Sequence, residues 1–208
     1  MRCSATVVEL RRVGNTAGVR RSFTFEGHRF ALGRGVFDPV RHLSGVALAN
    51  QLADVVAEHA PDGRSALDLG TGCGLLAASL ARHGLRVVAT DVSAGAVRYA
   101  TANCAGIDVD VRHGDMFAPV MGEQFDLVVV NPPYERVEAS RRQREAFTSE
   151  DFLERFGAQV HDFAPVAVLG FPVDQREVLE ATGLVFDLWR TVATSGRDLG
   201  VFVAAATV

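Results

Sequence analysis

The stretch Ala66-Leu67-Asp68-Leu69-Gly70-Thr71-Gly72-Cys73-Gly74 decides the fold of this 208-residue chain. Its apolar start is typical of a buried strand, and its glycines form a turn that leaves the strand and opens a helix. The first N–H groups of such a helix are free to bind a ligand. The G-x-G-x-G spacing differs from that of dinucleotide-binding loops, and the acidic residue before the turn favours a cationic group over a pyrophosphate.

Strands and helices alternate on the carboxyl side of this turn. The expected strands are 66–69, 85–90, 109–113, 125–130 and 166–171, and the expected helices are 44–59, 75–83, 94–104, 150–161 and 174–182. Ser44 is the expected N-cap of the first helix. Residues 185–194 and 199–208 are expected to close the chain as an antiparallel hairpin. This order predicts an α/β fold, a Rossmann-like, doubly wound, seven-stranded and mostly parallel sheet with helices on both faces.

The first forty residues have a different pattern. Short strand-like runs at 6–10, 22–25 and 30–32 are separated by turn signals, so we expect a short N-terminal β extension. We divide the chain into residues 1–43, strands and lead-in that form a cap or substrate element, and residues 44–208, the main domain. The sequence leaves open whether residues 1–35 cap the main domain or pair with its sheet.

Composition narrows the function classes. The net charge of −4 and the isoelectric point near 5.9 argue against bulk, sequence-independent binding of nucleic acid. All basic residues are Arg, which excludes lysine-based catalysis. Cys3, Cys73 and Cys104 have no metal-ligand spacing, so no disulfide framework and no metal site are expected. No run approaches the roughly 18 apolar residues that span a bilayer, and we expect a cytoplasmic protein without membrane partners.

Acidic residues follow the next two strands. Asp91 ends the second strand, where a carboxylate can accept hydrogen bonds from both hydroxyls of a ribose. Gly114, Asp115 and Met116 follow the third strand, where the Asp115 side chain can accept from an adenine amino group while Met116 packs on the ring. Each position alone also fits a structural turn or cap. Their order at consecutive strand ends indicates one binding site.

The segment Asn131-Pro132-Pro133-Tyr134 follows the buried run 125–130. Two consecutive prolines make this backbone stiff and extended. An amide followed by an aromatic ring suits the binding of a planar, nitrogen-bearing group. The alternative is a strand-terminating turn with a surface Tyr.

Residues 65–134 resemble class I S-adenosylmethionine-dependent methyltransferases. Asn131-Pro132-Pro133-Tyr134 is similar to the (Asn/Asp)-Pro-Pro-(Tyr/Phe) motif of the amino-methylating branch, which includes nucleic-acid base and protein glutamine-N5 methyltransferases. The lead-in 35–39 and the helix from Ser44 resemble the short release-factor type. The match departs from that type at residues 40–44, where an acidic residue and a Ser or Thr usually follow the proline.

The resemblance implies that S-adenosylmethionine is the cofactor and S-adenosylhomocysteine the product. The implied catalytic residues are Asn131, Pro132, Pro133 and Tyr134. The implied cofactor-binding residues are Phe37, Pro39, Asp68, Gly70, Thr71, Gly72, Cys73, Gly74, Asp91, Asp115, Met116 and Asn131. In this scheme the Asn131 side-chain oxygen and the Pro132 carbonyl accept the two N–H protons of the acceptor, and Tyr134 stacks on its plane.

The acceptor stays open between several classes. A protein glutamine is the leading expectation, because the chain is short and acidic and carries no appended nucleic-acid module. A nucleic-acid base (adenine N6 or a guanine exocyclic amine) is the next, since arginines follow the motif at positions 136, 141, 142 and 144. Glutamates interleave with them, so a solvated face explains them as well. A small-molecule N- or O-methyltransferase and a noncatalytic cofactor-binding partner subunit are further alternatives. The oligomeric state is open.

Overall fold

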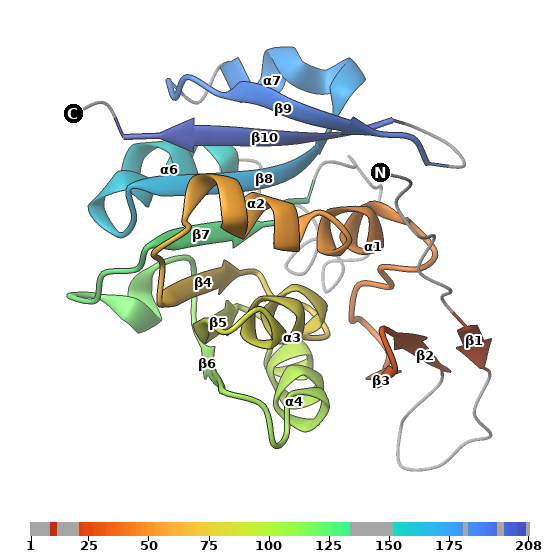
Figure 1. The fold of residues 1–208 in the computed structure, drawn as a ribbon. Coiled ribbons are helices and arrows are strands. Elements are labelled where there is room, and N and C mark those ends of the chain that lie inside the picture. The colour runs from red at the N-terminus through yellow and green to blue at the C-terminus, as the bar shows by residue number, and fades with distance from the viewer. Residues whose placement is uncertain (1–8, 12–20, 134–151, 181–182, 195–197, 207–208) are drawn as a thin grey trace.

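A seven-stranded sheet forms the centre of the computed structural model, which describes residues 9–11, 21–133, 152–180, 183–194 and 198–206 (Figure 1). Its order is β6-β5-β4-β7-β8-β10-β9. The strands are β4 (Ser65–Leu69), β5 (Arg86–Asp91), β6 (Val109–His113), β7 (Leu127–Val130), β8 (Val166–Pro172), β9 (Asp187–Val192) and β10 (Leu199–Ala205). The first five are parallel, and β10 is antiparallel to both of its neighbours. The expected parallel sheet and the antiparallel C-terminal hairpin are confirmed.

Helices cover both faces of the sheet. One hydrophobic cluster joins the sheet to α1 (Ser44–Ala49), α2 (Leu52–His59), α3 (Leu75–Arg82) and α4 (Ala94–Asn103). The other joins it to α6 (Phe152–Gln159), α7 (Arg176–Glu180) and the short helices η1 (Ala118–Val120) and η2 (Val160–Asp162). A third short helix, η3 (Val173–Gln175), leads into α7. None of the helices in these ranges has the length and apolar character that crossing a membrane requires.

The alternation of side chains along the central strands explains why both faces are covered. In β7, Leu127 and Val129 belong to the α1–α4 cluster, whereas Val128 and Val130 belong to the α6–α7 cluster. All four are fully buried. A strand that is apolar at every position has apolar side chains on both faces of the sheet. These side chains are all buried only when helices pack on each face.

The expected single helix 44–59 is instead two helices that meet at Asn50 and Gln51. The backbone tightens there, since the N–H of Gln51 bonds to the carbonyl of Leu48, three residues back. The Gln51 side chain is buried and accepts a 2.6 Å hydrogen bond from Arg190 of β9. The expectation that Ser44 is the N-cap is wrong. Leu43 takes this position with φ 56°, and Ser44 lies buried inside the helix.

The N-terminal strands β1 (Glu9–Arg11), β2 (Arg21–Phe25) and β3 (His28–Leu32) form a separate antiparallel sheet, in which β2 and β3 are a hairpin. The expected N-terminal β extension is confirmed. Glu26 and Gly27 both have positive φ, as a two-residue type I′ turn requires. The hairpin's Phe23 and Phe30 share the hydrophobic cluster of α1–α4. The division at residue 43 stays a prediction, and residues 6–8 of the first expected strand lie outside the described ranges.

Candidate active site

Three strands of the sheet end at the same level. Leu69 of β4 pairs with Thr90 of β5 on one side and with Val130 of β7 on the other. The next residues along these strands open the site, in the order Asp91, Gly70 and Asn131. The turn follows β4 and Asn131 follows β7, which is the neighbouring strand. Since neighbouring strands lie about 4.8 Å apart, this is also the distance that separates the start of the turn from Asn131 along the sheet. The chain continues from β4 to β5 on one side and from β7 to β8 on the other side. Open α/β sheets bind ligands at such a change of direction.

The polar side chains at this edge share one face. Ala66, Ala89 and Val129 point into the α1–α4 cluster. Successive side chains alternate between the faces of a strand, so the residue two positions later points the same way. These residues are Asp68, Asp91 and Asn131. The structure thus brings together three of the side chains that the sequence predicts for one site.

Asp68 lies beneath the glycine-rich turn and is fully buried. Its Oδ2 accepts a 2.6 Å hydrogen bond from the Thr71 hydroxyl and a 3.0 Å hydrogen bond from the backbone N–H of Ala77 in α3. Its Oδ1 is buried and accepts no hydrogen bond from any of the described residues. Burial raises the pKa of the Asp68 carboxyl to about 7. Asp68 therefore ties the turn to the helix that follows, with one oxygen left over.

The upper side of the turn is open. Gly70 and Gly72 have φ of 74° and 58°, and a Cβ atom on either would meet no atom of the described residues within 4 Å. The N–H groups of Gly70 and Thr71 each donate a 2.9 Å hydrogen bond to the Thr90 carbonyl. Hydrogen bonds to β5 thus fix the backbone of the turn, while the space beside its two glycines is open among the described residues. Such a cradle lets a ligand approach the backbone closely.

Asp91 holds the turn from the side of β5. Its Oδ2 accepts a 2.9 Å hydrogen bond from the N–H of Gly72, and its Oδ1 accepts one of 2.8 Å from the N–H of Ser93. Burial raises the pKa of this carboxyl as well. Val92, the next residue, is 47% exposed, and its carbonyl lies 2.9 Å from a ring nitrogen of His113.

The two cysteines near the turn are not nucleophiles. Burial raises the pKa of the Cys73 and Cys104 thiols to about 12 each. Both are therefore neutral at physiological pH. A contact of Cys73 with the cofactor stays a prediction.

The third strand end places Asp115 and Met116 one strand further out, beyond β5. Asp115 is exposed, and its Oδ2 accepts a 2.5 Å hydrogen bond from Arg155 of α6. Met116 has φ 48° and is buried in the α6–α7 cluster together with Phe117. An adenine contact of either side chain stays a prediction.

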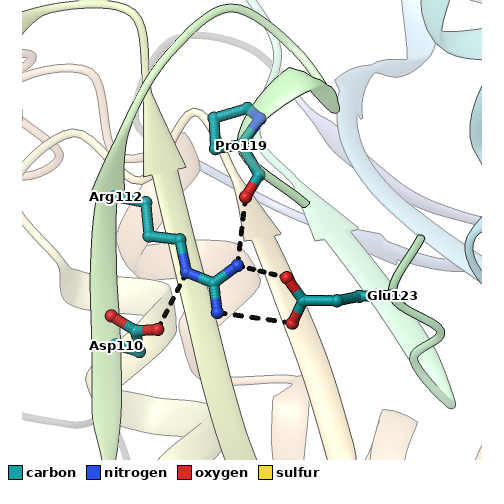
Figure 2. A network of polar contacts seen from close by, with 4 residues as sticks. All are labelled: Asp110, Arg112, Pro119 and Glu123. Atoms are coloured by element: carbon teal, nitrogen blue, oxygen red, sulfur yellow. Dashed lines mark hydrogen bonds and ion pairs between the residues drawn. The ribbon is translucent and has the colours of Figure 1, made fainter. Parts of the chain in front are cut away.

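An arginine network holds the segment that carries Asp115 (Figure 2). Arg112 of β6 donates 2.8 Å to Asp110, 3.0 Å to the Pro119 carbonyl and, through both terminal nitrogens, to the carboxylate of Glu123. These partners raise the pKa of the Arg112 guanidinium, the Glu123 hydrogen bond being the largest cause. The network closes the segment after β6 back onto its own strand.

Asn131 follows β7 at the edge, and its buried Oδ1 has no hydrogen-bond partner among the residues that the structure describes. Gly170 of β8 lies beside it. A Cβ atom on Gly170 would lie 3.4 Å from this oxygen and 3.1 Å from Cδ2 of Leu48 in α1. The glycine therefore leaves room next to the amide, and the sequence predictions missed it. Pro132 is buried and Pro133 half-buried, whereas Tyr134 and the arginines at positions 136–144 lie outside the described residues.

Phe37 and Pro39 pack at the start of α1. A Cβ atom on Gly45 would lie 2.8 Å from Cβ of Pro39 and 3.8 Å from Cε1 of Phe37. The Phe37 ring also stacks on His42, with 5.2 Å between the ring centroids. A role for these two residues in binding the cofactor stays a prediction.

A family model described as the methyltransferase small domain matches residues 43–155, from the start of α1 into α6. The chain belongs to this family. The matched range contains the glycine-rich turn, Asp91, Asp115 and the Asn131–Tyr134 segment. The small-domain family thus covers the whole predicted site except Phe37 and Pro39.

The curated relatives of this chain include two types of methyltransferase. It is 32% identical over 187 residues to the release factor glutamine methyltransferase of Bacteroides thetaiotaomicron, covering 87% of this chain and 57% of the relative. It is 38% identical over 109 residues to that of Mycolicibacterium smegmatis, covering 50% and 37%. It is 42% identical over 80 residues to the ribosomal RNA small subunit methyltransferase C of Alcanivorax borkumensis, covering 38% and 23%. The chain spans less than two thirds of each of these relatives.

Solved structures of methyltransferases share the fold. A 16S rRNA N2 methyltransferase from T. thermophilus, in complex with AdoMet and guanosine, matches with a TM-score of 0.57 and 22% identity over 89% of this chain and 50% of that one. The tRNA (uracil-54, C5)-methyltransferase of Pyrococcus abyssi, in complex with S-adenosyl-L-homocysteine, matches with 0.60 and 18% over 86% and 43%. At these identities the likeness concerns the Rossmann-like fold of the family.

Proposed function

We propose that this chain transfers the methyl group of S-adenosylmethionine to the planar side-chain nitrogen of a protein glutamine. One observation carries the transfer to a planar nitrogen, and the relatives support the choice of glutamine. The buried, unpartnered amide oxygen of Asn131 lies on the strand next to the open glycine-rich turn, on the same face. A buried polar atom without a partner is costly, and an N–H of the acceptor would satisfy it.

The residues at the strand ends fit the methyl donor. The glycine surface is open where a Cβ atom would find free space, and Asp68 keeps one buried oxygen without a partner. Asp91 would accept the ribose hydroxyls, Val92 would contact the adenine ring, and Asp115 would accept from its amino group. When bound, S-adenosylmethionine supplies an electrophilic methyl group on a sulfonium.

The chain's contribution to the reaction is mainly positional. An amide nitrogen is a poor nucleophile because its lone pair is delocalised. Asn131 Oδ1 and the Pro132 carbonyl would accept its two N–H groups, which directs the lone pair toward the methyl group. Both acceptors belong to a stiff, partly buried segment, so little reorganisation accompanies the reaction. Tyr134 would stack on the amide plane, and the released proton would pass to water.

The relatives support a protein acceptor. Release factor glutamine methyltransferases match up to 87% of this chain, and a ribosomal protein uL3 glutamine methyltransferase also matches. The net charge of −4 gives no general affinity for nucleic acid. The match to the Bacteroides thetaiotaomicron enzyme covers 57% of that relative.

A guanine exocyclic amine in ribosomal RNA is the second candidate. The 42% identity to a ribosomal RNA methyltransferase over 80 residues favours it. A guanine amine is also planar and also presents two N–H groups. The Asn131–Pro132 arrangement would serve both acceptors equally well.

The test is transfer of labelled methyl from S-adenosylmethionine into lysate fractions treated with protease or with nuclease. Label that protease removes and nuclease leaves supports the protein acceptor, and mass spectrometry then locates the methylated glutamine. The opposite pattern supports RNA, and label in a small species that survives both treatments contradicts the proposal. Asn131→Ala is the matched control, expected to lose turnover while its affinity for S-adenosylhomocysteine stays within about tenfold.

A further inference from the structure

Asn103, the last residue of α4, joins the N-terminal hairpin to the glycine-rich turn through its side chain. Its Oδ1 accepts a 2.9 Å hydrogen bond from the N–H of Ala31. Its Nδ2 donates 3.0 Å to the carbonyl of Ala31 and 2.8 Å to the carbonyl of Cys73. Asn103 is only 6% exposed. One acceptor and both donors of the amide are thus used, between segments that are far apart in the sequence.

Toward the N-terminal hairpin, the Asn103 side chain bonds to the outer edge of β3, which no other described strand covers. β3 is the outer strand of the N-terminal sheet, and the amide bonds both backbone groups of Ala31 as a neighbouring strand would. A ring nitrogen of His28 also lies 2.6 Å from the Asn103 backbone carbonyl. The chain just after β3 packs closely on α4, since a Cβ atom on Gly33 would lie 2.2 Å from the Tyr99 ring.

On the turn side, the bonded carbonyl belongs to the segment that forms the cradle. Gly74, the next residue, has φ 86°, and a Cβ atom there would lie 2.8 Å from Cys104 Sγ and 3.3 Å from Cα of Ala100. The end of α4 therefore supports the back of the turn, whereas Gly70 and Gly72 are open on its front. A displacement of the α4 end would move the cradle with it.

The chemistry of the amide explains the residue type. Two carbonyls face Nδ2 and one N–H faces Oδ1, so the position requires two donors and one acceptor on a short planar group. Aspartate has the same shape but would turn a carboxylate oxygen toward both carbonyls. Alanine would leave three backbone groups without partners.

We propose that Asn103 is a positioning residue for the methyl-donor cradle, and that the N-terminal hairpin braces the cradle through it. The hairpin thus contributes to the donor end of the site through Ala31, which bonds the Asn103 amide. The identity of the ligand rests on the proposed function, whereas the brace itself is testable without any ligand.

The experiment compares Asn103→Asp with His28→Leu. The second variant removes a contact between the same two elements but leaves all three hydrogen bonds of the Asn103 amide in place. Hydrogen exchange is measured on the ligand-free proteins, followed by calorimetry with S-adenosylhomocysteine and by melting temperatures. We expect Asn103→Asp to speed exchange at residues 70–77 and to weaken S-adenosylhomocysteine binding by about tenfold, the effect of one neutral hydrogen bond. His28→Leu should change neither and only lower the melting temperature.

Exchange at residues 70–77 that is the same in Asn103→Asp as in the wild type would overturn the brace. Equal acceleration in both variants would also overturn it, because a general loosening of the fold would then explain the effect. If Asn103→Asp does not fold, Asn103→Ala removes the amide without adding a charge, and the same two outcomes apply. If the wild type does not bind S-adenosylhomocysteine, the proposed function fails, and the exchange data alone decide the brace.

Discussion

The hydroxyl of Thr71 donates a 2.6 Å hydrogen bond to the carboxylate of Asp68 inside the protein, where Thr71 is 6% exposed and Asp68 is fully buried. This bond joins the end of β4 to the turn that follows it. The same carboxylate oxygen accepts from Ala77 in α3. One buried oxygen thus fixes strand, turn and helix relative to one another.

Thr71→Val should weaken cofactor binding. The valine keeps the shape of threonine but removes the donor, so Asp68 loses its shortest hydrogen bond and the turn loses its tie. We expect the dissociation constant for S-adenosylhomocysteine to rise by about tenfold, as for one hydrogen bond to a buried carboxyl group. Thr71→Ser retains the hydroxyl and should bind within about twofold of the wild type. Calorimetry on both variants checks this, and equal affinities for valine and serine would contradict it.

The stability of the protein should depend on pH through Asp68. Its pKa is about 7 in the folded protein against 3.8 for an ordinary Asp, because burial disfavours the charged form. Between these values the folded state holds a proton that the unfolded chain has released. This contribution is complete below about pH 4 and is lost as the pH rises through 7.

Asp68→Asn, which does not titrate, provides the reference for this effect. The free energy of unfolding of the wild type should fall relative to that of Asp68→Asn between pH 5 and pH 8, as measured in urea. A constant difference across this range would show that the carboxyl is not the titrating group.

Asp126 lies at the amino end of β7, and it should give the stability of the protein the opposite dependence on pH. Its Oδ2 accepts hydrogen bonds of 2.8 Å from the Arg64 N–H and of 2.9 Å from both the N–H and the hydroxyl of Ser65. These bonds, the one from Arg64 first, lower its pKa. Its contribution to stability is therefore present at neutral pH and lost as the pH falls through the lowered pKa.

Asp126→Ala should lower the free energy of unfolding at pH 7 by about 1 kcal/mol, a value reduced by the partial exposure of the group. The difference from the wild type should shrink at pH 3. Urea titrations at both pH values measure it, and a difference that persists unchanged at pH 3 would contradict the assignment.

Gly170→Ala should impair the acceptor end alone. The added methyl group would lie 3.4 Å from Oδ1 of Asn131 and would press on Leu48 at 3.1 Å. We expect kcat/KM for the acceptor to fall by about tenfold, since the added methyl group takes up the space beside the amide oxygen, while S-adenosylhomocysteine affinity stays unchanged. The double variant Gly170→Ala with Leu48→Val relieves the crowding, so it should regain stability but not turnover. Recovery of turnover in that variant would mean that packing, not the amide, was affected.

The sequence predicted most of the fold because its signals are local. The apolar runs of β4, β7 and β8 and the glycines after β4 are read from neighbouring residues. The break at Asn50 and Gln51 was not predicted, because the apolar periodicity of residues 44–59 continues across it. The hydrogen bond of Gln51 to Arg190, far along the chain, leaves no signal in the local sequence. Ser44 matched a cap by type, but the chain reaches the helix through Leu43 in a left-handed conformation.

The sequence predicted only those residues of the candidate site whose role is indicated by their position next to an apolar run. Asp68, Asp91 and Asn131 each stand at the end of an apolar run, and the structure brings them to one face of one edge. Asn103 carries no such signal, since a single polar residue in a helix is unremarkable until Ala31, 72 positions away, is seen beside it. Gly170 is a similar case, because its importance comes from the side chains that occupy the space it leaves.

The shared level at which β4 and β7 end has a consequence for how such an enzyme diversifies. In the proposed function, the spacing between the glycine-rich turn and Asn131 is set by a backbone ladder, with Leu69 paired to Val130. New loops and extensions around the edge would then alter which molecule is recognised while this spacing is inherited unchanged.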